Sequence, residues 1–350
     1  MWNAVTSMLG IGSRSEDPRG ECPPPMSLHS ANIAAERSCV RLRSRGWLDR
    51  ENEVYVSVPT DISGQCNVIF FPGDVQDYKA AMLSGPFADY CDYAYEAVAD
   101  LLSTKFGPAS NVWVVRPSRF KHGAYSSFDN FVTSNEYGAA LRYEPTACAT
   151  KHLASLMHNT QAALRRQGVN VSTAVPMHLL GFSKGGIVLN QLVTELVRCS
   201  LNKKRSFSGQ LQQGSAFAST RQFFSNINSI HWLDPGNGSL QGAMPTGDGC
   251  LSVLAQYEQL RLFVHVTPYQ YEARTRPWIK AEVNSFVNKM NLHGADVQLI
   301  IYNESGEGSL ASHFRILVYF EASRSMRAKG EAVTNSPEHA VQPVRIQVCK

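Results

Sequence analysis

The sequence lacks the features that mark several large classes of protein. Its longest apolar runs are the length of a strand, well short of the ~20 continuous apolar residues that a bilayer-spanning helix needs. The eight cysteines are scattered, with no C-x-x-C pair and no close Cys/His grouping, so we expect reduced thiols. The net charge of +4 over 350 residues gives no reason to expect a nucleic-acid partner. These absences argue against a membrane-spanning helix, a Cys/His zinc site and a nucleic-acid partner, but they leave every class of globular enzyme open.

Motifs for cofactors are also missing. The chain contains no HExxH, no P-loop and no glycine fingerprint of a dinucleotide fold, so we expect neither a metal nor a cofactor. What is present is typical of a globular protein, with 43% hydrophobic and 18% charged residues. A chain of 350 residues favours one large domain with tails.

Apolar periodicity alternates between strand-like and helical along the chain. Residues 39–42 and 53–58 predict an antiparallel edge of a sheet, because the second run alternates apolar and polar side chains. Buried strands and helices then follow one another, which predicts a doubly wound, mostly parallel α/β sheet. The predicted strands are 67–71, 111–115, 177–180, 229–233, 262–266 and 297–302. The predicted helices are 93–106, 146–167, 185–197, 251–260, 278–290 and 313–320.

Composition sets the expected boundaries of this domain. Residues 1–38 are rich in Ser, Pro, Gly and charge and predict a disordered leader. Arginines near its end resemble an organellar transit sequence, with a plain basic surface segment as the alternative. The folded domain is expected over 39–322, with a flexible excursion at 202–221 and a disordered tail at 323–350.

A G-x-S-x-G motif lies at 181–185, between a predicted strand and a predicted helix. In a nucleophile elbow the serine occupies a strained turn, and the flanking glycines avoid clashes with neighbouring backbone. The following helix directs its N–H groups at the serine oxygen. The motif in this context predicts an α/β-hydrolase-like fold with Ser183 as nucleophile; an ordinary glycine-rich turn is the alternative.

A serine nucleophile needs a base, which in this fold follows the last strand. His313 meets that requirement, although it could instead cap a helix or lie at the surface. His231 and His265 lie within apolar strands and are expected to be core residues. His122, in a long loop, stays a candidate.

The acid of the triad is expected at Asp234, which ends the strand 229–233 before a Pro-Gly turn. An Asx-turn role is the alternative for this residue. The fold more often places its acid after the next strand, but that turn, Thr-Pro-Tyr-Gln at 267–270, contains no carboxylate. Glu272 is the alternative acid.

Acyl transfer also needs N–H donors for the developing oxyanion. Lys184 is expected to supply one from its backbone, and Asp74 or Val75 the other. A carboxylate at this point would oppose an oxyanion unless it were paired. We therefore expect the side chain of Asp74 to pair with that of Lys184 across the mouth of the pocket.

The loop at 117–145 is long, irregular and rich in aromatic residues. A loop of this length in a compact domain is usually functional, which favours a pocket cover over the active edge, with a packed surface loop as the alternative. Its aromatic residues are Phe120, Tyr125, Phe128, Phe131, Tyr137 and Tyr143.

Five blocks together resemble the chromosome 2 open reading frame 69 family. They are FPGDVQDY at 71–78, GFSKGGIVLNQL at 181–192, WLD at 232–234, VTPYQ at 266–270 and HFR at 313–315. The similarity covers roughly residues 66–320. It implies a hydrolase fold, a serine-hydrolase-like site that includes Ser183, Asp234 and His313, a mitochondrial location and a role in respiratory function. The weak transit character of the leader leaves a cytoplasmic location as the alternative.

Two functions follow from these features. The first is a serine esterase or thioesterase that acts on a small acyl-containing substrate or a lipid, and the aromatic loop favours an apolar acyl chain. The second is a non-catalytic hydrolase-fold protein that binds a protein partner or ligand. The unusual place of the acid and the carboxylate of Asp74 keep this second function open.

Overall fold

The computed structural model describes residues 36–198, 219–302, 308–322 and 345–349. A nine-stranded sheet has the order β1-β2-β4-β3-β7-β8-β9-β10-β11, and a small hairpin, β5-β6, lies apart from it. The strands of the large sheet are β1 Arg37–Arg45, β2 Glu51–Pro59, β3 Cys66–Phe71, β4 Ser110–Val115, β7 Met177–Phe182, β8 Ile227–Leu233, β9 Arg261–Val266, β10 Val297–Tyr302 and β11 Arg345–Cys349. The hairpin pairs β5 Arg119–Lys121 with β6 Tyr125–Ser127.

The strand pairing confirms the predicted fold class. Strand β2 is antiparallel to both β1 and β4, as expected for the edge, whereas β4, β3 and β7 to β11 are parallel. The first eight strands in chain order, without the hairpin, follow the order 1-2-4-3-5-6-7-8 of an α/β hydrolase.

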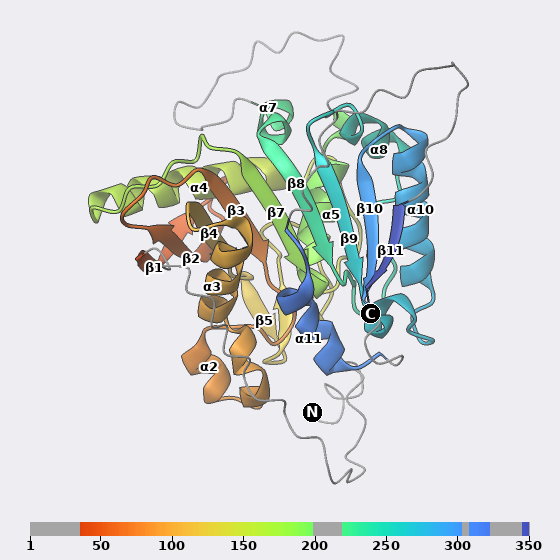
Figure 1. The fold of residues 1–350 in the computed structure, drawn as a ribbon, viewed down its shortest axis with the longest axis horizontal. Coiled ribbons are helices and arrows are strands. Elements are labelled where there is room, and N and C mark those ends of the chain that lie inside the picture. Colours follow the sequence, from red (N-terminus) through yellow and green to blue (C-terminus); the bar gives the residue numbers. More distant parts are fainter. Residues whose placement is uncertain (1–35, 199–218, 303–307, 323–344, 350) are drawn as a thin grey trace.

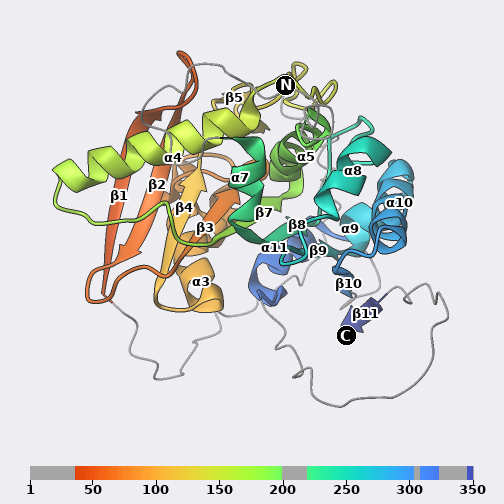
Figure 2. The same cartoon turned by 90° about the horizontal axis from the view of Figure 1, so that it is seen from above.

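Helices cover both faces of the sheet, with α4, α5, α8 and α10 on one side and α3 and α11 on the other (Figures 1 and 2). The helices are α2 Lys79–Leu83, α3 Tyr95–Phe106, α4 Ala149–Arg166, α5 Gly186–Thr194, α7 Thr220–Ser225, α8 Asp248–Leu254, α9 Pro268–Tyr271, α10 Trp278–Leu292 and α11 Leu310–Tyr319, with short 3-10 turns η1 Ala88–Tyr93 and η2 Ser183–Gly185.

Alternation along the buried strands explains the two layers of core. In β3, Ile69 belongs to the cluster that contains α4, α5, α8 and α10 residues, while Val68 and Phe70 belong to the cluster that contains α3 and α11 residues. All three side chains are fully buried. A strand covered on both faces reads as a continuous apolar run, as this one does.

Two segments differ from the expected boundaries. Residues 345–349, within the tail expected to be disordered, form β11, which pairs in parallel with β10. The excursion expected at 202–221 ends in ordered structure, because Ser219 caps α7 by accepting a hydrogen bond from the N–H of Gln222. The rest of that excursion and the leader up to residue 35 lie outside the described residues.

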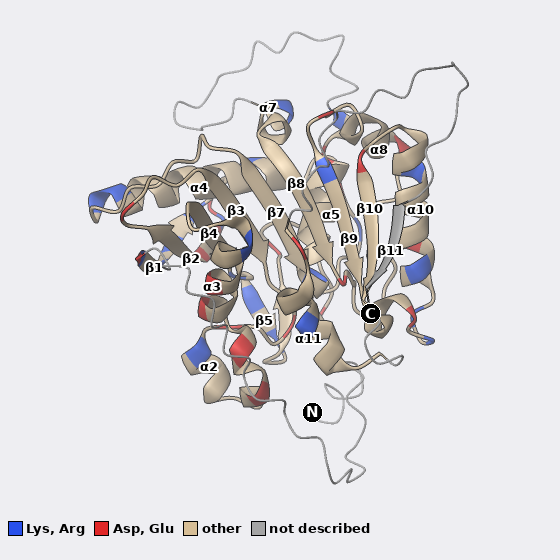
Figure 3. Ribbon diagram, in the orientation of Figure 1, with Lys and Arg blue, Asp and Glu red and all other residues tan. Residues whose placement is uncertain are grey.

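Lys and Arg residues are interspersed with Asp and Glu residues along the ribbon of the described elements (Figure 3). None of the described helices combines the length and apolar character needed to cross a bilayer. The five cysteines described by their side chains are free thiols; they are Cys39, Cys66, Cys91, Cys148 and Cys250.

Candidate active site

Ser183 occupies a strained turn between β7 and α5. Its φ of 51° lies in the left-handed region, which a non-glycine residue adopts only where its surroundings enforce it. The flanking glycines are sterically required: a Cβ at Gly185 would lie 1.9 Å from the carbonyl oxygen of Phe71, and one at Gly181 would lie 2.8 Å from that of Gly185. A nucleophile elbow requires a strained, glycine-flanked turn of this kind.

Asp234 and His313 are in direct contact. Nδ1 of His313 lies 2.6 Å from Oδ2 of Asp234, and both side chains are buried. The same carboxylate accepts hydrogen bonds from the N–H and the hydroxyl of Thr267, at 2.8 and 2.5 Å. Asp234 has a φ of 46° and is fully buried, and its carboxylate is held by contacts with His313 and with two donors of Thr267.

The register of the sheet brings the serine and the acid together. Phe182 pairs with Leu233, so Ser183 and Asp234 follow directly on neighbouring strands at the carboxyl edge. Parallel sheets place their sites at that edge.

His313 reaches the same edge from the first turn of α11. Ser309 and Ser312 form a capping box there, which fixes where the helix begins, three residues before the predicted start. The imidazole lies between aromatic neighbours, with its centroid 4.6 Å from the ring of Phe182 and 4.7 Å from that of Tyr269. The side chain of His313 is therefore packed against two aromatic rings.

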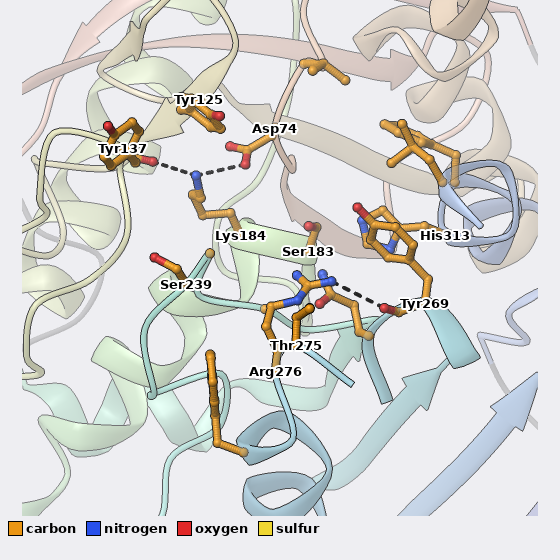
Figure 4. A pocket seen from close by; sticks show the side chains of 17 residues that line it. Asp74, Tyr125, Tyr137, Ser183, Lys184, Ser239, Tyr269, Thr275, Arg276 and His313 are labelled. Atoms are coloured by element: carbon orange, nitrogen blue, oxygen red, sulfur yellow. Dashed lines mark hydrogen bonds and ion pairs between the residues drawn. The ribbon is translucent and has the colours of Figure 1, made fainter. Parts of the chain in front are cut away.

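A cavity of about 320 Å³ lies over these residues (Figure 4). Ser183 and His313 both line it, while Asp234 lies beneath. Among the described residues, the hydroxyl of Ser183 makes no hydrogen bond to His313, as is frequent for catalytic pairs without bound substrate. The cavity lining also includes Asp74, Val75, Tyr125, Tyr137, Lys184, Gly236, Gly238, Ser239, Tyr269, Gln270, Thr275, Arg276, Trp278, Leu310 and Phe314.

Asp74 and Lys184 form a nearly buried ion pair at one wall of the cavity. Nζ of Lys184 lies 2.8 Å from Oδ2 of Asp74 and donates a second hydrogen bond, of 2.7 Å, to the carbonyl of Tyr137. Burial lowers the pKa of Lys184, and the neighbouring carboxylate opposes that shift. The expected pairing of these two side chains is therefore present, and it turns the carboxylate toward a cation.

One expected oxyanion donor is already occupied. The N–H of Val75 donates to the carbonyl of Ala124 at 2.9 Å. The expectation that Val75 supplies an oxyanion donor is therefore wrong. The reason is the loop at 117–145, whose backbone crosses above this turn and takes the donor. The N–H of Asp74 is left as the second candidate beside that of Lys184.

The loop at 117–145 is partly wall and partly core. Tyr125 and Tyr137 line the cavity, as a pocket cover would. Phe128 and Phe131 instead pack on Phe71 inside the domain, at ring-centroid distances of 6.1 and 5.5 Å. The aromatic content of this loop therefore does not translate directly into an apolar acyl pocket.

Comparison with known proteins identifies the family. The model of the C2orf69 family matches residues 45–174 and 165–296, which is most of the chain. The chain belongs to the C2orf69 family. The resemblance drawn from the five sequence blocks is thereby confirmed.

Curated relatives agree with this assignment to the C2orf69 family. The "Mitochondrial protein C2orf69 homolog" of Danio rerio is 28% identical over 269 residues, covering 73% of this chain and 74% of its own. The "Mitochondrial protein C2orf69" of Homo sapiens is 29% identical over 302 residues, covering 72% and 73%. The names of these relatives confirm the expected mitochondrial location.

Solved structures similar to this C2orf69 family chain include esterases. Esterase Est22 has a TM-score of 0.45 at 12% identity, covering 81% of this chain and 76% of its own. Carboxyl esterase 2 of Tuber melanosporum has a TM-score of 0.40 at 12% identity, covering 91% and 92%. The fold assignment rests on the strand order.

The remaining candidates from the sequence lie away from the cavity lining. Glu272 is exposed and faces Lys280 at 3.9 Å, so it does not contact His313. His231 and His265 are fully buried and hydrogen-bonded to each other at 3.2 Å, as expected for core residues. His122 packs on the ring of Tyr137.

Sequence reasoning missed three residues of this C2orf69 family site. Thr267 holds the acid, Tyr269 packs on the base, and Arg276 lines the cavity beside Tyr269 (Figure 4). The block VTPYQ, noted for the family resemblance and for its lack of a carboxylate, carried a signal for the first two, since it ends a buried strand at the active edge. Arg276 lies in an irregular turn, where no periodicity marks it. In the part of the chain that is described, no group of three or more His, Cys, Asp or Glu could hold a metal.

Proposed function

We propose that this protein is a mitochondrial serine hydrolase of the esterase or thioesterase type, and that it supports respiratory function by acting on an acyl substrate. The observation that carries the proposal is the 2.6 Å contact between His313 and a fully buried Asp234, next to a serine held in an elbow turn. A buried carboxylate fixes the tautomer of a catalytic imidazole in this way.

The proposed reaction has two halves. With the Nδ1 proton donated to Asp234, Nε2 of His313 is free to accept the proton of Ser183. The serine oxygen attacks the acyl carbonyl, and the leaving alcohol or thiol departs with that proton, which gives an acyl-serine. Water then attacks the acyl-serine and gives a proton to His313, and His313 passes that proton to the serine oxygen as the acid departs, which restores free Ser183 and a neutral imidazole.

The oxyanion of each half is proposed to lie between the N–H groups of Lys184 and Asp74. The Lys184 N–H follows the nucleophile at the start of the helical turn, where the dipole favours negative charge. The carboxylate of Asp74 is turned away into its contact with Lys184 Nζ and the N–H of Ser126, at 2.7 Å for the latter. The two charges at this wall therefore leave the oxyanion site without a facing anion.

A non-catalytic binding protein is the second candidate. The observation in its favour is that Ser183 and His313 are not hydrogen-bonded to each other in the described structure. If the protein only binds a partner or ligand, the rate of hydrolysis measured with Ser183→Ala should equal that of the wild type.

The test is hydrolysis of a short series of acyl esters and acyl thioesters by purified protein. We expect Ser183→Ala and His313→Ala each to lower kcat/KM by at least about 10³-fold, since nucleophile and base act as a unit. Ser239→Ala is a matched control, because Ser239 lines the same cavity but lies outside the proposed triad. Equal turnover by wild type and Ser183→Ala, with both folded, would remove the proposal.

A further inference from the structure

Arg276 is a cation of the cavity lining that has no carboxylate partner among the described residues. In the described part of the chain, Lys184 is paired with Asp74, and His313 is paired with Asp234. Arg276 lines the same cavity and forms no ion pair with any described carboxylate. Among the described residues of the lining, Arg276 therefore presents a positive charge that no carboxylate neutralises through an ion pair.

The guanidinium of Arg276 is held in place by contacts with Tyr269. One Nη2 donates to the carbonyl of Tyr269 at 3.3 Å, and the guanidinium carbon lies 5.4 Å from the centroid of the Tyr269 ring. That same ring contacts the imidazole of His313. Burial raises the pKa of Tyr269 to about 12, so the phenol stays neutral and adds no anion to the site. A single aromatic side chain thus sets the spacing between Arg276 and the proposed base.

We propose that Arg276 binds an anionic group of the substrate, a carboxylate or a phosphate, close to the acyl carbonyl that Ser183 attacks. The placement of the anionic group close to a carbonyl that Ser183 attacks rests on the proposed function. A guanidinium is planar and presents a fork of donors that matches the two oxygens of such a group. Figure 4 shows the side chains of Arg276 and Ser183 among those that line the same cavity.

The rest of the lining agrees with an anionic ligand rather than a purely apolar chain. The tyrosines of the loop at 117–145 present amphipathic rings, while its phenylalanines Phe128 and Phe131 lie in the core. A volume of about 320 Å³ is at the lower end for ligand pockets, which suits a short acyl group or a head group. The proposed substrate is therefore a small anionic ester or thioester.

The test measures binding without turnover. Ser183→Ala protein is titrated by calorimetry with monoethyl adipate, with its neutral counterpart ethyl hexanoate, and with butyl phosphate. We expect at least one of the two anions to bind more tightly than ethyl hexanoate, and the tighter of the two identifies the group as carboxylate or phosphate. Adding Arg276→Gln should weaken that anion about tenfold and leave ethyl hexanoate unchanged. Arg276→Lys should recover part of the loss, because it keeps the charge but not the fork.

Arg274→Gln is the matched control, because Arg274 is exposed, lies two residues away and is outside the cavity lining. It removes the same charge and should leave anion binding within about twofold. Equal anion binding by the Arg276 and Arg274 variants, or equal binding of anion and neutral ester, overturns the inference. Binding is measured in Ser183→Ala protein and so does not depend on turnover. If the wild type proved to have no hydrolase activity while anion binding still depended on Arg276, only the proposed function would be refuted.

Discussion

Replacement of Asp234 by asparagine is expected to lower kcat for acyl transfer by about 10⁴-fold while the fold persists. The carboxylate accepts the Nδ1 proton of His313 at 2.6 Å, which leaves Nε2 as the acceptor for the serine proton. An amide placed there can present its NH₂ group to Nδ1 and so favour the opposite tautomer. The measurement is steady-state hydrolysis by Asp234→Asn, with circular dichroism to show that the protein is folded.

Glu272→Gln provides the matched control for this experiment. It makes the same carboxylate-to-amide change at the alternative acid, whose side chain is exposed and faces Lys280. We expect it to retain wild-type turnover. If the two variants lost activity equally, or if Asp234→Asn kept it, the assignment of the acid after β8 would be wrong.

Asp74→Asn is expected to destabilise the protein by about 3 kcal/mol, the cost of leaving a buried cation without its partner. Lys184 is only 3% exposed, and among the described residues its ammonium would keep only the carbonyl of Tyr137 as a hydrogen-bond partner. Lys184→Met in the Asp74→Asn background should recover part of the loss, because the charge that lacks a partner is then gone. Urea unfolding of wild type, Asp74→Asn, Lys184→Met and the double variant gives the coupling energy, expected at about 2 kcal/mol; additive losses would show that the pair does not act as a unit.

The same variant should change the pH dependence of stability. Burial lowers the pKa of Lys184 in the folded protein, and Asp74 opposes this, so its removal lowers the folded-state pKa further. The unfolded chain keeps the proton up to the ordinary lysine range. Between those two values the unfolded state binds more protons, so stability rises with pH, and the rise should begin at lower pH in Asp74→Asn than in wild type.

Local patterns were sufficient for strands β1 to β10 of the large sheet and for the elements that border the site. Each buried strand is a short apolar run followed by a turn, and a glycine-flanked serine after β7 can only occupy the carboxyl edge. Asp234 was found for the same reason, because it ends the next strand. The pairing of Asp74 with Lys184 followed from electrostatics alone, since an unpaired carboxylate beside an oxyanion would oppose the reaction.

Features that depend on distant segments could not be read in this way. Val75 was expected to offer its N–H, but Ala124, 49 positions along the chain, accepts it. Strand β11 pairs with β10 although residues 323–344 separate it from α11, so no local signal gives its place. Arg276 gains its significance only from the arrangement of Tyr269 and His313 around it. In each case the sequence shows the residue type, but it does not show which distant residue or strand lies against it.

The most direct test of the central claim is labelling of the purified protein with a fluorophosphonate probe, read by intact mass and by the modified peptide. The account predicts one adduct, on Ser183, that is absent in Ser183→Ala and lost in folded His313→Ala, since only an activated serine reacts. A folded wild-type protein that remained unlabelled, or that was labelled at another serine, would contradict it.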